Sequence, residues 1–118
     1  MAFEYRLRRA EDIRLAATRG RRLGMALFRV SVRPNSLGHA RFSCIISRKV
    51  DKRAVVRNRI RRRVREYLRH SPIFLALPID VILTAEKSAA TATKMSLYEV
   101  LDEMVTRLST GKNPSSIY

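Results

Sequence analysis

The spacing of apolar residues changes along the chain, and each change predicts a different element. Residues 10–19 have the period of a helix, with an apolar side formed by Ile13, Ala16 and Ala17. Residues 24–33 change to a period of two, in which three apolar residues alternate with Arg29, Ser31 and Arg33, as is typical of a strand buried on one face. The apolar members of this strand are Phe28, Val30 and Val32.

A turn-forming stretch with Pro34, Asn35 and Gly38 separates that strand from residues 40–47, which read as a second strand. We expect these two strands to pair in antiparallel fashion, with a third strand if residues 23–27 pair separately. Residues 79–85 are a short and nearly continuous apolar run. Such a run predicts a strand that is buried on both faces.

Two longer segments have the helical period. The first begins near Ala54 and is stopped by Ser71 and Pro72. Its apolar side is Val56, Ile60, Val64, Tyr67 and Leu68, and its opposite side is Asn58, Arg62, Arg65 and Arg69. The second is the last helix, which Ser96 and Glu99 would open as a capping box. Its predicted buried side is Leu97, Val100, Leu101, Met104 and Leu108.

This order of elements predicts an α+β fold, a two-layer sandwich in which helices pack against one small sheet. The 118 residues suit a single domain, 1–118, with one core. We expect residues 1–9 and 111–118 to be frayed at the ends of that domain.

The charge of the chain is concentrated in one segment and points to an anionic partner. The whole chain carries +15, and residues 48–69 alone carry eleven basic and two acidic residues. Like charges stacked on one helix face oppose each other by about 0.2–0.5 kcal/mol per pair, so an external polyanion is expected to neutralise them. Arginine dominates the segment, and its planar guanidinium makes two-pronged contacts with phosphate oxygens.

Candidate catalytic chemistry is sparse. Cys44 is the single cysteine, which excludes an intrachain disulfide and fits a small core residue in a reducing, cytoplasmic setting. His39 and His70 read as loop or helix-end residues, and we find no paired carboxylates, no metal-ligand spacing and no nucleophile with a base. We therefore expect no catalytic residue and no metal on the protein. No apolar stretch is long enough to span a membrane.

The basic segment resembles the signature of the bacterial ribonuclease P protein subunit. The family pattern is a basic pair, a short linker, an alanine, Arg-Asn-Arg, a basic run and Arg-Glu. It is matched by Arg48-Lys49, Ala54, Arg57-Asn58-Arg59, Ile60-Arg61-Arg62 and Arg65-Glu66. The turn at 34–39 and the strand opening with Asp80 also look like the family. The resemblance covers about residues 6–108.

The resemblance implies an α-β-β-β-α-β-α sandwich with a left-handed βαβ crossover that carries the basic helix. It implies that a catalytic RNA, using bound Mg²⁺, cleaves precursor tRNA while a single copy of the protein binds that RNA. The implied RNA-binding residues are Arg48, Lys49, Arg53, Arg57, Asn58, Arg59, Arg61, Arg62, Arg65 and Arg69.

A groove beside the sheet would hold the single-stranded 5′ leader of the precursor tRNA. We expect its lining to include Ile13, Ala17, Phe28, Val30 and Ser47. The family often has aromatic residues on its first helix, where this chain has Ile13 and Ala17.

Two other classes of protein share the basic helix. A general nucleic-acid binder of the ribosomal or nucleoid kind would need no particular RNA and would support no processing reaction. A membrane-surface helix would leave its apolar side free. The strands on either side of the helix need covering, so a core role for Ile60 and Val64 is the stronger interpretation.

Overall fold

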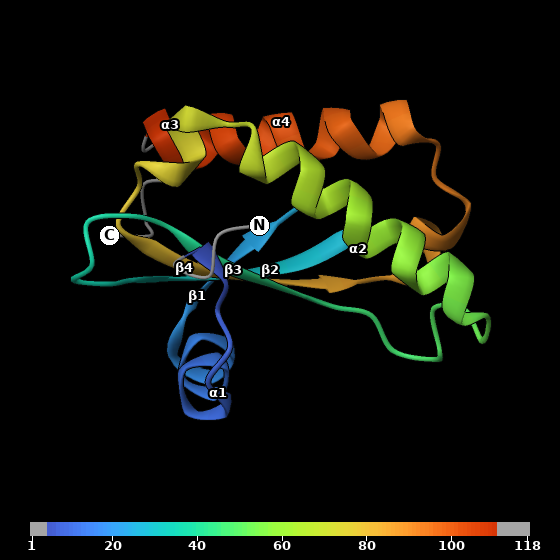
Figure 1. The fold of residues 1–118 in the computed structure, drawn as a ribbon, viewed down its shortest axis with the longest axis horizontal. Coiled ribbons are helices and arrows are strands. Elements are labelled where there is room, and N and C mark those ends of the chain that lie inside the picture. Colours follow the sequence, from blue (N-terminus) through green and yellow to red (C-terminus); the bar gives the residue numbers. More distant parts are fainter. Residues whose placement is uncertain (1–4, 111–118) are drawn as a thin grey trace.

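The computed structural model describes residues 5–110, and it contains a central sheet with helices on both sides (Figure 1). The helices are α1 (Ala10–Arg19), α2 (Ala54–Arg69), α3 (Pro72–Leu75) and α4 (Lys94–Thr110), with a 3-10 helix, η2, at Lys87–Thr91. The strands are β1 (Arg21–Gly24), β2 (Phe28–Pro34), β3 (Arg41–Ile45) and β4 (Ile79–Ala85). The α+β class and the order of the main elements are as expected.

The strand order in the sheet is β1-β2-β4-β3. β2 pairs antiparallel with β1 and with β4, whereas β3 runs parallel to β4. The expected antiparallel pairing of residues 24–33 with 40–47 is therefore wrong, because β4 lies between those two strands. Six of the seven residues of β4 are buried, as expected for a central strand that is covered on both faces. α2 joins the parallel strands β3 and β4 as a βαβ crossover.

The expected long strand at 24–33 is divided into two. Residues 25–27 form the connection between β1 and β2, and Leu27 has a left-handed backbone with φ of 68°. The possible third strand, expected at residues 23–27, is present as β1 but lies at Arg21–Gly24. A left-handed residue cannot continue a strand, which is why the regular alternation begins only at Phe28.

The main core lies between the sheet and the pair α2 and α4. Phe28, Val30 and Val32 face it from β2, and α2 contributes its predicted apolar side, of which Tyr67 alone is only partly buried. α4 contributes Leu97, Leu101, Met104, Val105 and Leu108. Val105 takes a buried place that the sequence pattern gave to Val100, which is partly exposed.

α1 lies on the opposite face of the sheet, where Ala16 packs on Leu7 and Ile82 in a second, small cluster (Figure 1). The helices thus form a partial third layer, in contrast to the expected two-layer arrangement. Small residues allow this close approach. A Cβ on Gly20 would lie 2.2 Å from the carbonyl oxygen of Ala16, so only glycine fits at the end of α1.

The helix ends differ from the expectation in two places. α2 begins at Ala54 and ends at Arg69 as predicted, but Ser71 and Pro72 also start the short helix α3, where the Ser71 hydroxyl accepts from the Phe74 N–H at 3.3 Å. The capping box at Ser96 is wrong. Thr93 caps α4, since its hydroxyl oxygen accepts from the Ser96 N–H at 3.0 Å.

Candidate nucleic-acid interface

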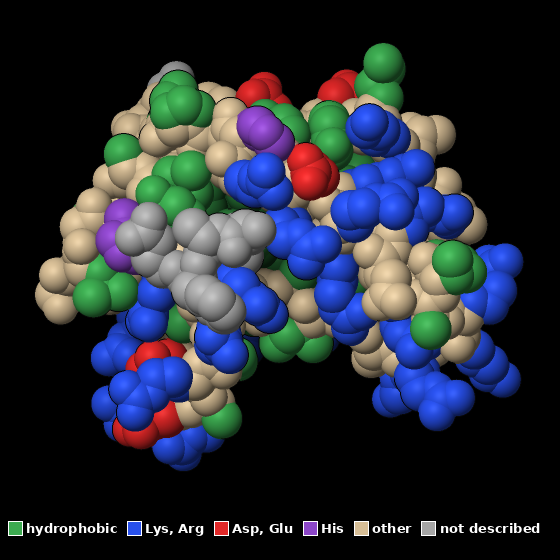
Figure 2. Space-filling view, viewed as in Figure 1, with side chains coloured by type: hydrophobic (Ala, Val, Ile, Leu, Met, Phe, Trp, Pro, Cys, Tyr) green, Lys and Arg blue, Asp and Glu red, His purple; other side chains and the backbone are tan. Residues whose placement is uncertain are grey.

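The outward side of α2 forms a continuous basic surface. Asn58, Arg62, Arg65 and Arg69 are exposed, as the helical period predicts, and Arg59 is exposed beside them. Lysine and arginine side chains form a broad field over this helix and the loop before it (Figure 2). The surface is rigidly placed, because Val56, Ile60, Val64 and Leu68 anchor the other side of the helix in the core.

The loop before α2 is organised by its single acidic residue. The Asp51 carboxylate accepts from the Arg53 backbone N–H at 2.8 Å and from its guanidinium at 3.1 Å. The hydrogen bonds from Arg53 lower the pKa of Asp51 to about 2. Arg57 then donates to the backbone carbonyls of Asp51 and Lys52 at 2.8 and 2.9 Å. Arg53 and Arg57, two of the predicted RNA-binding residues, therefore also hold the start of the helix.

Two further members of the predicted set have neighbours on the helix. Arg61 donates to the side-chain oxygen of Asn58 at 3.0 Å, which leaves the Asn58 amide N–H groups available. The Glu66 carboxylate lies 3.9 Å from the Arg69 guanidinium, so Arg69 has an ion-pair partner one turn back along the helix.

The remaining predicted basic residues have no such partner. The side chains of Arg48, Lys49, Arg59, Arg62 and Arg65 make no hydrogen bond or ion pair with any residue between 5 and 110. Unpaired arginines at fixed spacing on a packed helix form a preorganised site for phosphate groups.

A pocket of about 190 Å³ lies where α2 meets the outer edge of β3. Arg6, Arg61 and Arg65 surround it, and Ser43 and Cys44 form part of its wall. Burial raises the pKa of the Cys44 thiol to about 12, an effect that the nearby Arg61 charge partly opposes. The thiol is therefore neutral at physiological pH, and Cys44, which is partly buried, packs against the main core.

The second face of the sheet is open beyond α1. The side chains that point to this face lie in register across the strands, in one row Ser31–Ile82–Ser43 and a second row Arg29–Thr84–Ile45. α1 covers Ile82, and the loop 48–53 stands on the other side together with Lys87. In the space-filling view the underside of the molecule is hollow between these two lobes (Figure 2). We call this hollow the sheet groove.

The structure places only some of the predicted groove residues in the sheet groove. Ala16 of α1 points at the sheet, and Ile13 and Ala17 lie on the flank of the helix away from Asp12, partly exposed. Ser47 is exposed at the start of the far lobe. Phe28 and Val30 were wrongly predicted, since they are 1% and 2% exposed and face the core on the other side of the sheet.

The groove residues that the sequence interpretation missed are the alternate members of the same strands. They are Arg29, Ser31, Ser43, Ile45 and Thr84. The alternation of residues 28–33 could have predicted these groove residues. It places Phe28 and Val30 in the core, so their sequence neighbours must face the opposite side of the sheet.

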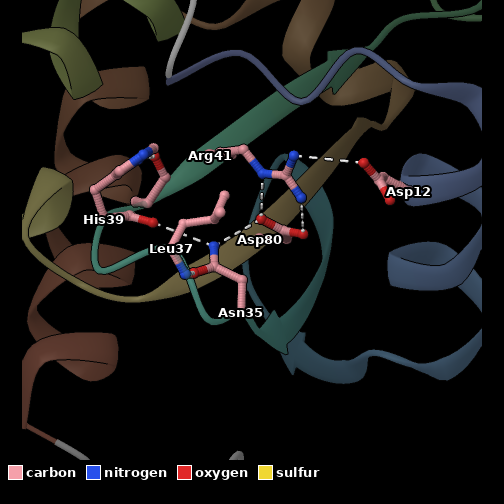
Figure 3. Close-up of polar contacts among 7 residues, drawn as sticks. Asp12, Asn35, Leu37, His39, Arg41 and Asp80 are labelled. Atoms are coloured by element: carbon pink, nitrogen blue, oxygen red, sulfur yellow. Dashed lines mark hydrogen bonds and ion pairs between the residues drawn. The ribbon is translucent and has the colours of Figure 1, made fainter.

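A buried polar network fixes α1 against the sheet. Asp80 is 6% exposed and accepts from Arg41 at 2.9 and 2.7 Å and from the Asn35 amide at 2.8 Å (Figure 3). Arg41 also reaches Asp12 of α1 at 3.4 Å. The Asp80 carboxylate raises the pKa of Arg41 above its ordinary value. The network therefore sets one wall of the sheet groove.

Residues 5–110 contain no group of three or more His, Cys, Asp or Glu side chains placed to hold a metal ion. None of the helices in this range is long and apolar enough to cross a membrane.

The fold and the basic surface define a small α+β protein that presents a rigid arginine-rich helix and an adjoining groove to nucleic acid. Comparisons with known proteins all identify the same family. The family model for ribonuclease P matches residues 1–109. The chain belongs to the ribonuclease P protein family, whose members are the accessory subunits of an endoribonuclease ribonucleoprotein.

Relatives and solved structures agree with this assignment. The chain is 34% identical over 106 residues to the ribonuclease P protein component of Aliivibrio fischeri, covering 90% of each chain. It is 32% identical over 107 residues to that of Coxiella burnetii, covering 91% of this chain and 87% of the relative. The RNase P protein of Thermotoga maritima superposes with a TM-score of 0.77 at 25% identity, covering 86% and 96%. That of Staphylococcus aureus gives 0.76 at 26%, covering 88% and 96%.

Proposed function

We propose that α2 docks its exposed arginine face on the catalytic RNA of ribonuclease P. The observation that carries this proposal is the set Arg59, Arg62 and Arg65, which have no partner among the described residues and stand on a helix fixed by its buried side. Their spacing suits a folded RNA surface, because each guanidinium can bridge two phosphate oxygens at a set position.

The sheet groove is the second part of the proposal. It adjoins the basic surface at the loop 48–53 and at the edge of β3, so one continuous RNA substrate can lie in it while α2 holds the catalytic RNA. Among residues 5–110, α1 is the helix on this face of the sheet, and the groove beyond it is open (Figure 1). A single strand fits such a groove better than a duplex, which supports the 5′ leader of precursor tRNA as its ligand.

The chemistry is proposed to reside in the RNA. Cleavage of a phosphodiester needs Mg²⁺ or an equivalent to activate water and stabilise the leaving oxygen, and the RNA phosphates are the expected ligands of that ion. The protein contributes positive charge. It lowers the repulsion between the catalytic RNA and its substrate, so less free Mg²⁺ should be required. A single copy of the protein for each RNA is sufficient for both contacts.

Reconstitution tests the proposal. Purified protein is added to a bacterial ribonuclease P RNA at a Mg²⁺ concentration too low for the RNA alone, and cleavage of precursor tRNA is followed. We expect cleavage at the mature 5′ end only when both components are present. No stimulation by the protein would overturn the proposal.

Matched charge deletions separate specific docking from general attraction. Arg62→Gln removes one charge from the basic surface, and Lys94→Gln removes one from the exposed start of α4. We expect the first change to weaken stimulation roughly tenfold, the scale of one lost charge-assisted hydrogen bond. The second should have little effect. Equal losses from both would indicate a general nucleic-acid binder.

A further inference from the structure

We propose that the sheet groove of this protein holds the leader by its phosphate backbone, with Arg29 as the anchoring side chain, and does not stack on the leader's bases. This inference rests on the proposed function, because it concerns the same groove and the same single-stranded ligand. It predicts that binding is tolerant of leader sequence.

The first argument is the position of the aromatic rings. Proteins that grip single strands through their bases place aromatic side chains on the binding surface. The described part of the chain has six such side chains: Tyr5, Phe28, Phe42, Tyr67, Phe74 and Tyr98. The three phenylalanines are buried in the main core, two tyrosines contact each other between α2 and α4, and the third packs edge-on against His39. None of the six faces the groove.

The second argument is the floor itself. Ser31, Ser43 and Thr84 present hydroxyl groups, each of which can donate and accept a hydrogen bond. A group that does both cannot distinguish one base edge from another. Ile45, which is 38% exposed, adds apolar contact without hydrogen-bonding groups. The floor can therefore support a strand but has little means of selecting its bases.

The third argument is the single charge on that floor. Arg29 comes from β2, lies in register beside Thr84 and is exposed. Its side chain makes no hydrogen bond or ion pair with any residue of the described chain. Gly24 is its neighbour on β1, so no β1 side chain covers Arg29 at this position, and Arg22 and Glu86 line one pocket with it. An unpaired guanidinium in this position fits a phosphate group.

The test uses three substrates and the assembled holoenzyme. One precursor tRNA has a natural leader, one has no leader, and one has a leader of the same length in which the bases are removed and the sugar-phosphate backbone is kept. Binding of each is measured for the holoenzyme and for the RNA alone, so that the contribution of the protein is their ratio.

We expect the protein to favour the natural leader over the leaderless substrate, and the abasic leader to retain that preference within about threefold. A base-stacking groove would instead lose roughly 5- to 150-fold for each base removed. A loss of that size would overturn the inference while leaving the proposed function intact. No preference for a leader of either kind would instead count against the groove as the leader site.

Variants of Arg29 identify the anchor. Arg29→Gln should weaken leader-dependent binding about tenfold and reduce the salt dependence, the slope of log K against log salt, by about 0.7. Arg29→Lys should restore most of the affinity, since it keeps the charge. Lys94→Gln, on the other face of the sheet, is the control with equal charge loss. A silent Arg29→Gln, or an unchanged salt slope, would remove Arg29 from this role.

Discussion

Arg41 and Asp80 form a two-armed ion pair across the parallel strands β3 and β4, with nitrogen–oxygen distances of 2.9 and 2.7 Å. The pair is mostly enclosed and is completed by Asn35 and Asp12, so that the turn after β2, two strands and α1 meet at one carboxylate. Asp80, near the start of β4, thus has a structural role in this chain.

Replacing that carboxylate should destabilise the fold strongly. Asp80→Asn removes the charge that both arms of Arg41 contact and leaves it only the more distant Asp12 carboxylate at 3.4 Å; losing one member of such an enclosed pair typically costs about 3–5 kcal/mol. The measurement is urea unfolding of the variant and the parent protein. Glu103→Gln, which removes an exposed carboxylate paired with Arg107, is the control and should change the free energy of unfolding by less than about 0.5 kcal/mol. Equal stability of Asp80→Asn and the parent would contradict this account.

The two sides of α2 should respond differently to the same substitution. Ile60 is 3% exposed, so Ile60→Asp buries an unpaired charge, and we expect a loss of several kcal/mol and of cooperative unfolding. Val55 lies on the same helix but is 70% exposed, so Val55→Asp should be nearly neutral. Thermal unfolding followed by circular dichroism compares the two. Similar melting curves would mean that the apolar side of the helix is wrongly assigned.

The acidic residue of the loop before α2 should titrate unusually low. The pKa of Asp51 is lowered to about 2 by hydrogen bonds from Arg53, and its ordinary value is about 3.9. A lowered pKa stabilises the folded state above the ordinary value, and this contribution is lost as pH falls from about 4 towards 2. Carbon-detected NMR titration of the carboxyl group measures it. Arg53→Ala should return the pKa towards 3.9, and an unchanged value would exclude Arg53 as the cause.

Docking on a specific RNA should depend on geometry as well as charge. Arg62→Lys keeps the charge and loses the two-pronged guanidinium, and Asn58→Ala removes no charge at all. We expect each to weaken binding to the cognate catalytic RNA by about 1–2 kcal/mol and to leave binding to a scrambled RNA unchanged. Titrations at fixed salt provide the comparison.

Asn58 requires a control of its own, because its side-chain oxygen accepts from Arg61. Asn58→Asp keeps that acceptor but replaces the amide donor with a negative charge, whereas Arg61→Gln removes the donor to Asn58. If Asn58→Ala and Arg61→Gln have additive effects on cognate binding, Asn58 contacts the RNA itself. Non-additive effects would show that it acts by orienting Arg61. If none of these variants changes the affinity for either RNA, the helix binds RNA only by general attraction between charges.

The thiol of Cys44 should be unreactive in the folded protein. Because burial raises its pKa to about 12, almost none is thiolate near neutral pH. Alkylation with iodoacetamide between pH 7 and 10 should be much slower than in urea-unfolded protein, where the pKa is about 8.5. A folded-state rate equal to the unfolded rate would contradict the assignment of Cys44 to the core.

Local patterns predicted the elements better than their arrangement. The periods of two and of 3.6 located β2, β4, α2 and α4, because burial on one side determines those patterns. The pairing of strands is different. Residues 28–34 and 41–45 carry the alternation of an ordinary hairpin, and only the apolar run at 79–85, far along the chain, explains why neither is the other's partner.

The candidate site was likewise predictable in part. The exposed arginines of α2 follow directly from helical geometry, but the loop contacts of Arg57 with the Asp51 and Lys52 carbonyls depend on three-dimensional closure. The predicted groove positions of Phe28 and Val30 were wrong. Burial decides against them, since a strand that covers the core with its large residues can offer a ligand only the residues between them.

The central position of β4 also sets an order of events during synthesis. β3 is complete at Ile45, yet its only neighbour among the named strands begins at Ile79. At about 5–20 residues per second, the ribosome needs roughly 2 to 7 s to reach that strand. The basic helix is made within this interval, before the sheet beneath it can close. A chain interrupted at residue 78 would therefore contain every arginine of α2 and lack β4, the strand on which α2 is positioned. The charged residues are synthesised before the sheet that positions them is complete.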